Sequence, residues 1–185
     1  MNDMRLEDRQ QIQDQAMAYA RGVDRRDWAL VRSAYHPDAH DDHGAYKGGV
    51  DGFIEWLERR HAHIAHSMHF VTNCLIEFAG PDRALCETYY LAQQTMGPEA
   101  GESRLMLLGD RKLAPDASVL MEVAGRYVDV FERRNGHWAI SDRTVVFEKV
   151  RASEDTSLPI SADWVPQRRD ADDRLGQMRR KLGLS

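Results

Sequence analysis

The chain has 185 residues, of which 42% are hydrophobic and 30% are charged. This balance is typical of one folded domain and excludes global disorder. The net charge of −5 provides no basic surface of the kind that binds nucleic acid. No apolar run reaches the roughly 18 residues of a membrane span, and the start is too polar for a signal peptide, so we expect a cytoplasmic protein without membrane partners. Cys74 and Cys86 lack metal-site spacing and are expected to be free, buried thiols.

The first third of the chain has the periodicity of helices. Residues 6–23 carry apolar side chains at intervals of three and four residues, on one helix face: Ile12, Ala16, Tyr19, Ala20 and Val23. Asp27 is a suitable N-cap for a short second helix that ends before Pro37. A third helix is predicted over residues 50–65. Residues 39–49, which are rich in His, Asp and Gly, are predicted to form a loop.

The period then changes to that of β-strands. Four strands are predicted, over residues 69–78, 83–95, 119–134 and 137–150. Asn135-Gly136 is a strong signal for a two-residue type I′ hairpin between the last two, and residues 97–115 are predicted to be a long loop. Because the strands follow the helices in a block, the fold class is α+β. We expect a cone-shaped α+β barrel in which three N-terminal helices pack on a curved antiparallel sheet.

We divide the chain into one domain, residues 1–150, and a charged tail, residues 151–185. The tail contains Pro159 and Pro166, and it could form a short helix that buries little by itself. We expect it to be a peripheral arm or a contact with another subunit.

Alternation along the strands predicts which side chains enter the cone. With His69 pointing inward, its face also carries Val71, Asn73 and Leu75. On the last strand, the inward set is expected to be Ser141, Arg143, Val145 and Phe147. The opposite face is apolar and is expected to be covered by another subunit, through Trp138, Ile140 and Val146.

Asp24 and His69 each have two interpretations. An aspartate between two helices is most often an N-cap or turn residue, and a single histidine on a strand is more often a core or rim residue than a catalytic one. If the two side chains meet, the carboxylate fixes the imidazole tautomer and leaves the other ring nitrogen free to accept a substrate proton. The pair would then be a general base.

Arg143 and three tyrosines are the other polar candidates. Arg143 lies among apolar residues, so it needs an acidic structural partner, for example Asp24, or an anion supplied by the substrate. Tyr19 is on the helix face that packs on the sheet, where its hydroxyl is either a core group or a group that polarises a substrate oxygen. The same two interpretations apply to Tyr90 and Tyr127.

The remaining histidines do not have the spacing of a metal site. They form two groups: His61, His63, His66 and His69, and His40 and His43 beside Asp38, Asp41 and Asp42. No HExxH or facial-triad spacing connects them, and we interpret the first group as surface residues at a helix end and the second as a solvated loop. No phosphate-binding loop or nucleophile motif is present, so we expect neither metal nor cofactor.

Three segments resemble the SnoaL-like branch of the nuclear transport factor 2-like superfamily. They are Gly22-Val23-Asp24 after the first helix, the HFVTN sequence at residues 69–73 and the FERRNGHWAISDR sequence at residues 131–143. The resemblance covers about residues 5–150. It is greatest to the group that contains scytalone dehydratase, bile-acid 7α-dehydratase and hexachlorocyclohexane dehydrochlorinase, whose members share a cofactor-independent elimination in which an Asp–His dyad removes a proton.

The resemblance implies that Asp24 and His69 are the dyad and that Arg143 is the pocket arginine. Tyr19 matches a tyrosine of the bile-acid enzyme where the dehydrochlorinase has lysine, which favours an oxygen leaving group over a halide. Ala92 stands near the position of an acidic residue of the bile-acid enzyme, so steroid dehydration does not carry over. Relatives of this branch form trimers, which makes a homotrimer the first expectation and a dimer the second.

We therefore expect a cofactor-independent, dehydratase-type lyase that acts on a hydrophobic, ring-containing small molecule. Its apolar lining is expected to comprise Val71, Leu75, Val123, Tyr127, Val145 and Phe147, with Tyr90 beside them. Two alternatives stay open: a non-catalytic ligand-binding or assembly module, such as a dioxygenase small subunit, and an isomerase or cyclase on the same fold. The module predicts a filled cone and an apolar outer sheet face. The lyase needs Asp24 and His69 in contact beside an open pocket.

Overall fold

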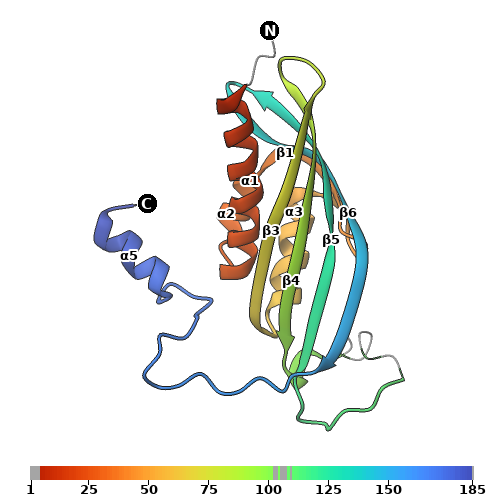
Figure 1. Ribbon diagram of the computed structural model, residues 1–185, viewed down its shortest axis with the longest axis vertical. Helices are drawn as coiled ribbons and strands as arrows, with labels where there is room; N and C mark the ends of the chain where they lie inside the picture. Colours follow the sequence, from red (N-terminus) through yellow and green to blue (C-terminus); the bar gives the residue numbers. More distant parts are fainter. Residues whose placement is uncertain (1–4, 102–103, 105–107, 109, 185) are drawn as a thin grey trace.

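A computed structural model describes residues 5–101, 104, 108 and 110–184 of the chain. Its helices are α1 (Leu6–Arg25), α2 (Trp28–Ser33), α3 (Val50–His61) and α5 (Arg174–Leu182), with a 3-10 helix, η1 (Pro98–Ala100). Its strands are β1 (Tyr35–Asp42), β2 (Lys47–Gly49), β3 (Ile64–Phe78), β4 (Arg83–Met96), β5 (Val119–Arg134) and β6 (His137–Glu154) (Figure 1). Part of the predicted loop, residues 102, 103, 105–107 and 109, lies outside the described residues, as do residues 1–4 and 185 at the ends of the predicted domain and tail.

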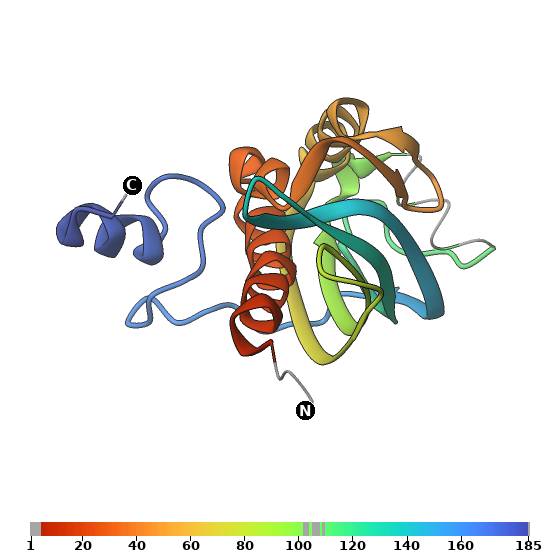
Figure 2. The ribbon, with the colours of Figure 1, turned by 90° about the horizontal axis from the view of Figure 1, so that it is seen from above.

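The α+β class is confirmed, and the sheet differs from the predicted one in three ways: its number of strands, one parallel pairing and its open edges. It has six strands in the order β2-β1-β6-β5-β4-β3, and β1 pairs with β6 in parallel while the other neighbours are antiparallel. It is also not closed into a barrel, because β2 and β3 are free edges. Figure 2 shows how the sheet curls, with α1 and α3 on its concave side. The space between these layers holds the core.

The prediction of a loop over residues 39–49 is wrong, because β1 and β2 occupy most of that segment. Its His, Asp and Gly residues have low strand propensity. Pairing with β6 and burial of Ala39 and Asp41 override this local preference. The third helix also ends earlier than predicted, at His61, since β3 begins at Ile64 and pairs with the end of β4.

Two local predictions, the N-cap of the second helix and the type I′ turn between the last two strands, are confirmed. The Asp27 side chain caps α2, accepting a hydrogen bond of 3.0 Å from the Leu30 backbone N–H. Asn135 and Gly136 have φ values of 53° and 80°, which is the left-handed pair that a type I′ turn requires. Both features depend on neighbours in the sequence, which explains why a local pattern sufficed.

Register shifts overturn two predictions about strand faces, because one extra residue in a strand moves every later side chain to the opposite face. The shift in β3 between Val71 and Cys74 leaves Leu75 62% exposed instead of inward. In the pairing of β5 with β6, Val130 lies opposite Asp142 and Phe131 opposite Ile140, so the extra residue, Ser141, is in β6. There, Trp138 and Ile140 are fully buried in the core instead of facing outward.

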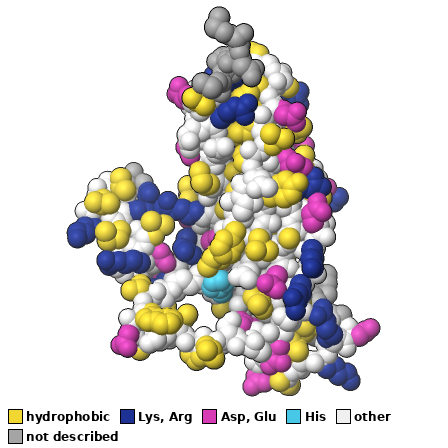
Figure 3. Space-filling model, in the orientation of Figure 1, with side chains coloured by type: hydrophobic (Ala, Val, Ile, Leu, Met, Phe, Trp, Pro, Cys, Tyr) yellow, Lys and Arg dark blue, Asp and Glu magenta, His cyan; other side chains and the backbone are white. Residues whose placement is uncertain are grey.

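The apolar outer face lies on β3 and β4 instead of β6. Its exposed side chains are Met68, Phe70, Leu85, Tyr89 and Leu91, and hydrophobic side chains are visible over these strands in Figure 3. Phe70 and Leu91 are paired directly across the two strands.

The tail leaves the lower end of β6, passes below the sheet in the view of Figure 1 and returns toward α1, where α5 stands apart from the sheet (Figures 1 and 2). Because β6 continues to Glu154, four residues of the predicted tail pair with β5. The division of the chain at residue 150 stays a prediction.

Candidate active site

Asp24 and His69 are in direct contact. Asp24 lies in the last turn of α1 and His69 lies on β3, and the two elements pack against each other. The His69 ring Nδ1 is 2.7 Å from Asp24 Oδ1, and the His69 backbone N–H donates to Asp24 Oδ2 at 2.8 Å. Ser67, two residues earlier on β3, donates its hydroxyl to Asp24 Oδ1 at 2.8 Å. Asp24 is therefore fixed by the strand that carries His69.

These hydrogen bonds set the charge and tautomer of the pair. Burial alone would raise the pKa of the Asp24 carboxyl, but the hydrogen bonds from His69 and Ser67 outweigh it and hold the pKa below its usual range. The carboxylate accepts a hydrogen bond from the N–H group at Nδ1 of His69, so the unprotonated ring nitrogen, with its lone pair, is Nε2. The His69 side chain is only 8% exposed.

His69 faces a cavity of about 210 Å³ between the helices and the sheet. Its polar lining side chains are Tyr19, His43, Arg60, His61, His69, Tyr90, Gln94 and Tyr127. The rest of the lining is apolar, with Trp56, Leu57, Met121 and Val123 among its members. Exposed Ala45, Phe147 and Val150 form the mouth. The cavity is thus apolar, with polar groups at separate points on its wall, as small-molecule sites usually are.

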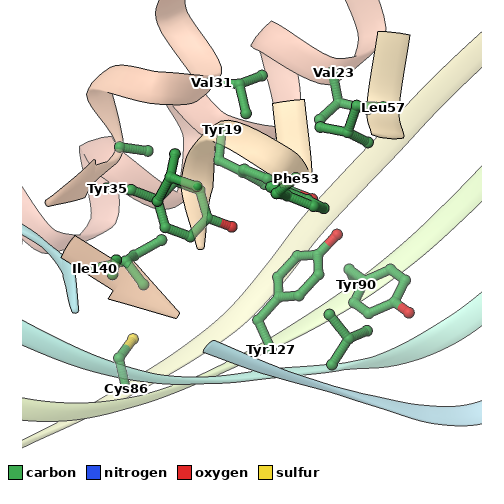
Figure 4. Close-up of a cluster of buried hydrophobic side chains, with 14 of the residues drawn as sticks. Tyr19, Val23, Val31, Tyr35, Phe53, Leu57, Cys86, Tyr90, Tyr127 and Ile140 are labelled. Carbon is green, nitrogen blue, oxygen red and sulfur yellow. The ribbon is translucent and has the colours of Figure 1, made fainter. Parts of the chain in front are cut away.

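Three tyrosine hydroxyls in the cavity wall are available to a ligand. The rings of Tyr90 and Tyr127 stack with centroids 4.3 Å apart, and Tyr19 meets Tyr127 edge-on at 5.6 Å (Figure 4). Within the described residues, none of the three hydroxyls has a hydrogen-bond partner. Gly125 makes room for Tyr90, because a Cβ there would lie 2.9 Å from the Tyr90 hydroxyl. Burial raises the pKa of Tyr90 to about 12, so its hydroxyl is a neutral donor.

Arg143 lies beneath the cavity and not in its wall. Its guanidinium donates to both carboxylate oxygens of Asp129, at 2.7 and 2.6 Å, and to the Tyr35 hydroxyl at 3.2 Å. It also lies 4.3 Å from the ring centroids of both Tyr19 and Tyr127. Burial would lower the pKa of Arg143, but the charge of Asp129 reverses that effect, and the guanidinium stays protonated. The acidic partner that Arg143 required is Asp129, not Asp24.

Of the predicted substrate-binding residues, four line the cavity and the others lie elsewhere. Tyr90, Tyr127, Val123 and Phe147 line the cavity. Val145 is buried in the core and Val71 lies in a groove between α1 and β3.

A second Asp–His pair faces the same cavity. His43 follows β1 and its Nδ1 is 3.1 Å from Oδ1 of Asp41, which is fully buried. The other Asp41 oxygen accepts a hydrogen bond of 2.7 Å from Tyr35, whose hydroxyl in turn accepts from Arg143. Our interpretation of this segment as a solvated loop missed the pair. The alternating burial of β1 was hidden by its polar composition.

Arg60 and His61 also line the cavity, from the last turn of α3. The Arg169 guanidinium of the tail lies 2.7 Å from His61 Nδ1 and donates to the backbone carbonyls of Asp24 and Val23, at 2.8 and 3.0 Å. Burial, together with the charge of Arg169, lowers the pKa of His61, so the ring is neutral. No sequence signal distinguished Arg60 from the exposed arginines around it.

In the part of the chain that the structure describes, no three His, Cys, Asp or Glu residues come together as metal ligands. No described helix combines the length and the apolar character that crossing a bilayer requires. Cys74 and Cys86 are unbridged, with their sulfurs 3.4 Å apart.

Residues 4–144 match the model of the SnoaL-like domain, and the chain belongs to this family, in agreement with the resemblance seen in its sequence. No curated protein sequence matches the chain. Its fold is similar to that of a hexachlorocyclohexane dehydrochlorinase from Novosphingobium barchaimii, at 21% identity over 85% of this chain and 96% of the other, with a TM-score of 0.64.

Two proteins from Novosphingobium aromaticivorans are similar in fold as well. One, provisionally assigned as a scytalone dehydratase, has 16% identity over 82% of this chain and 91% of its own, with a TM-score of 0.65. The other, provisionally assigned as an aromatic ring hydroxylase, has 24% identity over 81% and 94%, with a TM-score of 0.62. At these identities the similarities establish the fold alone.

Proposed function

We propose that this protein is a cofactor-independent lyase that eliminates water from a small, ring-containing substrate. The observation that carries the proposal is the 2.7 Å contact between Asp24 and His69 beside an apolar cavity. A carboxylate-oriented imidazole is a general base. The names of similar folds, a dehydrochlorinase and a protein assigned as a dehydratase, support elimination as the class of reaction.

Each step of the reaction has a side chain in the cavity wall. His69 Nε2 takes a proton from carbon, and the electron pair of that C–H bond forms the new double bond. The C–O bond breaks, and the hydroxyl leaves as water with a proton from protonated His43, which Asp41 orients. Both imidazoles then return to their starting protonation by exchange with solvent. Isomerisation would use His69 but would need no acid at a leaving group, so the second Asp–His pair favours elimination.

The tyrosine hydroxyls of the cavity wall hold the substrate oxygen. Arg143 does not touch substrate in this proposal. It supports the rings of Tyr19 and Tyr127 from beneath, at 4.3 Å from each centroid, and its charge favours the developing negative charge above them. It is therefore a positioning residue.

The size of the cavity restricts the substrate. A cavity of about 150 Å³ holds one benzene ring, so 210 Å³ suits one ring or two fused rings with small substituents. A steroid would extend through the mouth.

The base can be tested without the natural substrate. 5-Nitrobenzisoxazole is a flat bicyclic compound that opens to a coloured nitrophenolate when a base removes its C3 proton. We expect the protein to catalyse this elimination and His69→Ala to lower kcat/KM by about 10²–10⁴-fold. His63→Ala, at an exposed histidine, is the matched control. An inactive wild-type protein, or a His69→Ala variant with full activity, would contradict the proposal.

The non-catalytic module is the second candidate, because the outer face of β3 and β4 is apolar, as that alternative required. The cavity counts against it, since the module also required a filled cone. The same assay separates the two candidates. A non-catalytic module would not catalyse the elimination in a way that depends on His69, so His69→Ala would behave as the wild-type protein does.

A further inference from the structure

We infer that Arg60 and His61 form an anion subsite, and that the substrate is a ring compound that carries a carboxylate. The inference rests on the proposed function, because it names the substrate class of the same cavity. The inference also goes beyond the proposed function, since neither the sequence nor the proposed proton transfers gave Arg60 or His61 a role.

Arg60 is a cation in the cavity wall, and its partners among the described residues are uncharged. Its Nη2 donates to the Gln94 side-chain oxygen at 3.3 Å and meets Met121 sulfur at 3.8 Å, and its guanidinium carbon lies 5.8 Å from the Trp56 ring. No carboxylate among the described residues forms an ion pair with it. A guanidinium has five N–H donors, so most of them are left for a ligand. Burial lowers the pKa of Arg60, and an anion in the cavity would offset that effect.

The preceding residue shows what is unusual about this arrangement. Arg59 is on the same helix turn, is exposed to solvent and pairs with Glu55 at 4.0 Å. Arg60 instead points into the apolar space between α3 and the sheet, where an unneutralised charge is unfavourable.

His61 adds a second donor, and Arg169 fixes its direction. An arginine N–H can only donate, so His61 Nδ1, 2.7 Å from Arg169, must be an acceptor without a proton. The proton of the neutral ring is then on Nε2. Within the described residues, Nε2 has no hydrogen-bond partner. His61 is only 1% exposed and lines the cavity, so this N–H is available to a bound ligand.

A carboxylate matches this pair of groups. Arg60 and His61 offer donors alone, and an ionised carboxylate offers acceptors alone. A neutral ketone or amide would leave the charge of Arg60 unpaired. His69 lines the same cavity from β3, so a ring anchored by its carboxylate at α3 can present a C–H bond to the base.

Binding of benzoate and its neutral analogue benzamide tests the inference, by calorimetry on the full-length protein. We expect benzoate to bind more tightly than benzamide. Arg60→Met should weaken benzoate binding by about 10- to 100-fold, the range for a hydrogen bond to a charged group, and leave benzamide binding unchanged. Arg59→Met is the matched control and should bind both compounds as the wild type does.

Two further variants make the outcome decisive. Arg60→Lys keeps the charge and should keep most of the benzoate preference, so a loss equal to that of Arg60→Met would overturn the inference. His69→Ala should retain the preference, because binding needs no proton transfer. A wild-type protein that does not prefer benzoate, or an Arg60→Met variant that binds it equally well, also overturns the anion subsite. Benzoate selectivity without any elimination would instead contradict the proposed function alone.

Discussion

Two arginines packed between sheet and helices, Arg143 and Arg60, show how differently this protein treats a charge in two neighbouring regions. Beneath the cavity, Arg143 is fully buried, is bidentate to Asp129 and also bonds Tyr35. In the cavity wall, Arg60 contacts the side-chain amide of Gln94 and the sulfur of Met121. Both lie near aromatic rings. Burial alone therefore does not mark an arginine as a binding group, whereas a cavity-facing arginine that no described carboxylate neutralises has donors left for a ligand.

Breaking the Arg143–Asp129 pair should have the largest effect. Asp129→Asn leaves a buried, uncompensated guanidinium, and we expect the free energy of unfolding to fall by about 3–5 kcal/mol. Urea unfolding followed by circular dichroism measures it. Arg60→Met removes a charge that no carboxylate of the described residues neutralises and should change stability by less than about 1 kcal/mol. If the two variants were equally destabilised, the two regions would not differ as we describe.

Removing the tail anchor should have a smaller effect on stability. Arg169→Met deletes hydrogen bonds to the Val23 and Asp24 carbonyls, so we expect a loss of about 1–3 kcal/mol. It also frees His61 Nδ1, and the ring nitrogen shifts in ¹⁵N NMR should report loss of the single Nε2–H tautomer. Arg168→Met, at the exposed neighbour that pairs with Asp170, is the control. An unchanged His61 signal in Arg169→Met would refute the role of the tail.

The carboxylate of the Asp24–His69 pair should make the stability of the protein depend on pH. The folded pKa of Asp24 is lowered, so the unfolded state binds more protons in acid, and stability is lost as pH falls from the unfolded pKa of about 3.9 through the folded one. One such group contributes a slope of at most about 1.4 kcal/mol per pH unit. Asp24→Asn should flatten the loss of stability below about pH 4, measured by thermal unfolding between pH 2.5 and pH 6. A variant that follows the wild-type curve would exclude Asp24 as its source.

The smallest expected effect on folding lies on the outer face. We propose that copies of the chain associate through β3 and β4, as a homotrimer first and a dimer second. Phe70→Lys places a charge at a residue that is 45% exposed and should change the free energy of unfolding by less than about 0.5 kcal/mol. It should nevertheless lower the molar mass measured by light scattering. A monomeric wild-type protein, or a variant with unchanged mass, would rule out this interface.

Features that depend on near neighbours could be predicted from the sequence. The Asp27 cap, the Asn135-Gly136 turn and the apolar face of the first helix are of this kind. The contact between Asp24 and His69 was expected from a resemblance to relatives. From residue spacing alone, a catalytic pair was not favoured over the simpler interpretation, in which Asp24 is a helix cap and His69 is a core residue.

Features that depend on strand register could not be predicted. Leu75 and Trp138 were assigned to the wrong faces because a bulge leaves little trace in the residue pattern. The pair of Asp41 with His43 was hidden in a polar segment that becomes a strand only through β6.

The sequence by itself determined the α+β class, the order of the helices and most strands, and the two residues of the proposed base, because periodicity, turns and family motifs are local. Only the tertiary structure decided which arginine is neutralised and which faces the cavity. Arg143 and Arg60 carry the same charge, and the residues that precede each of them in the sequence include both apolar and charged types. What separates them is Asp129 on the neighbouring strand, and that contact exists only after the sheet has formed.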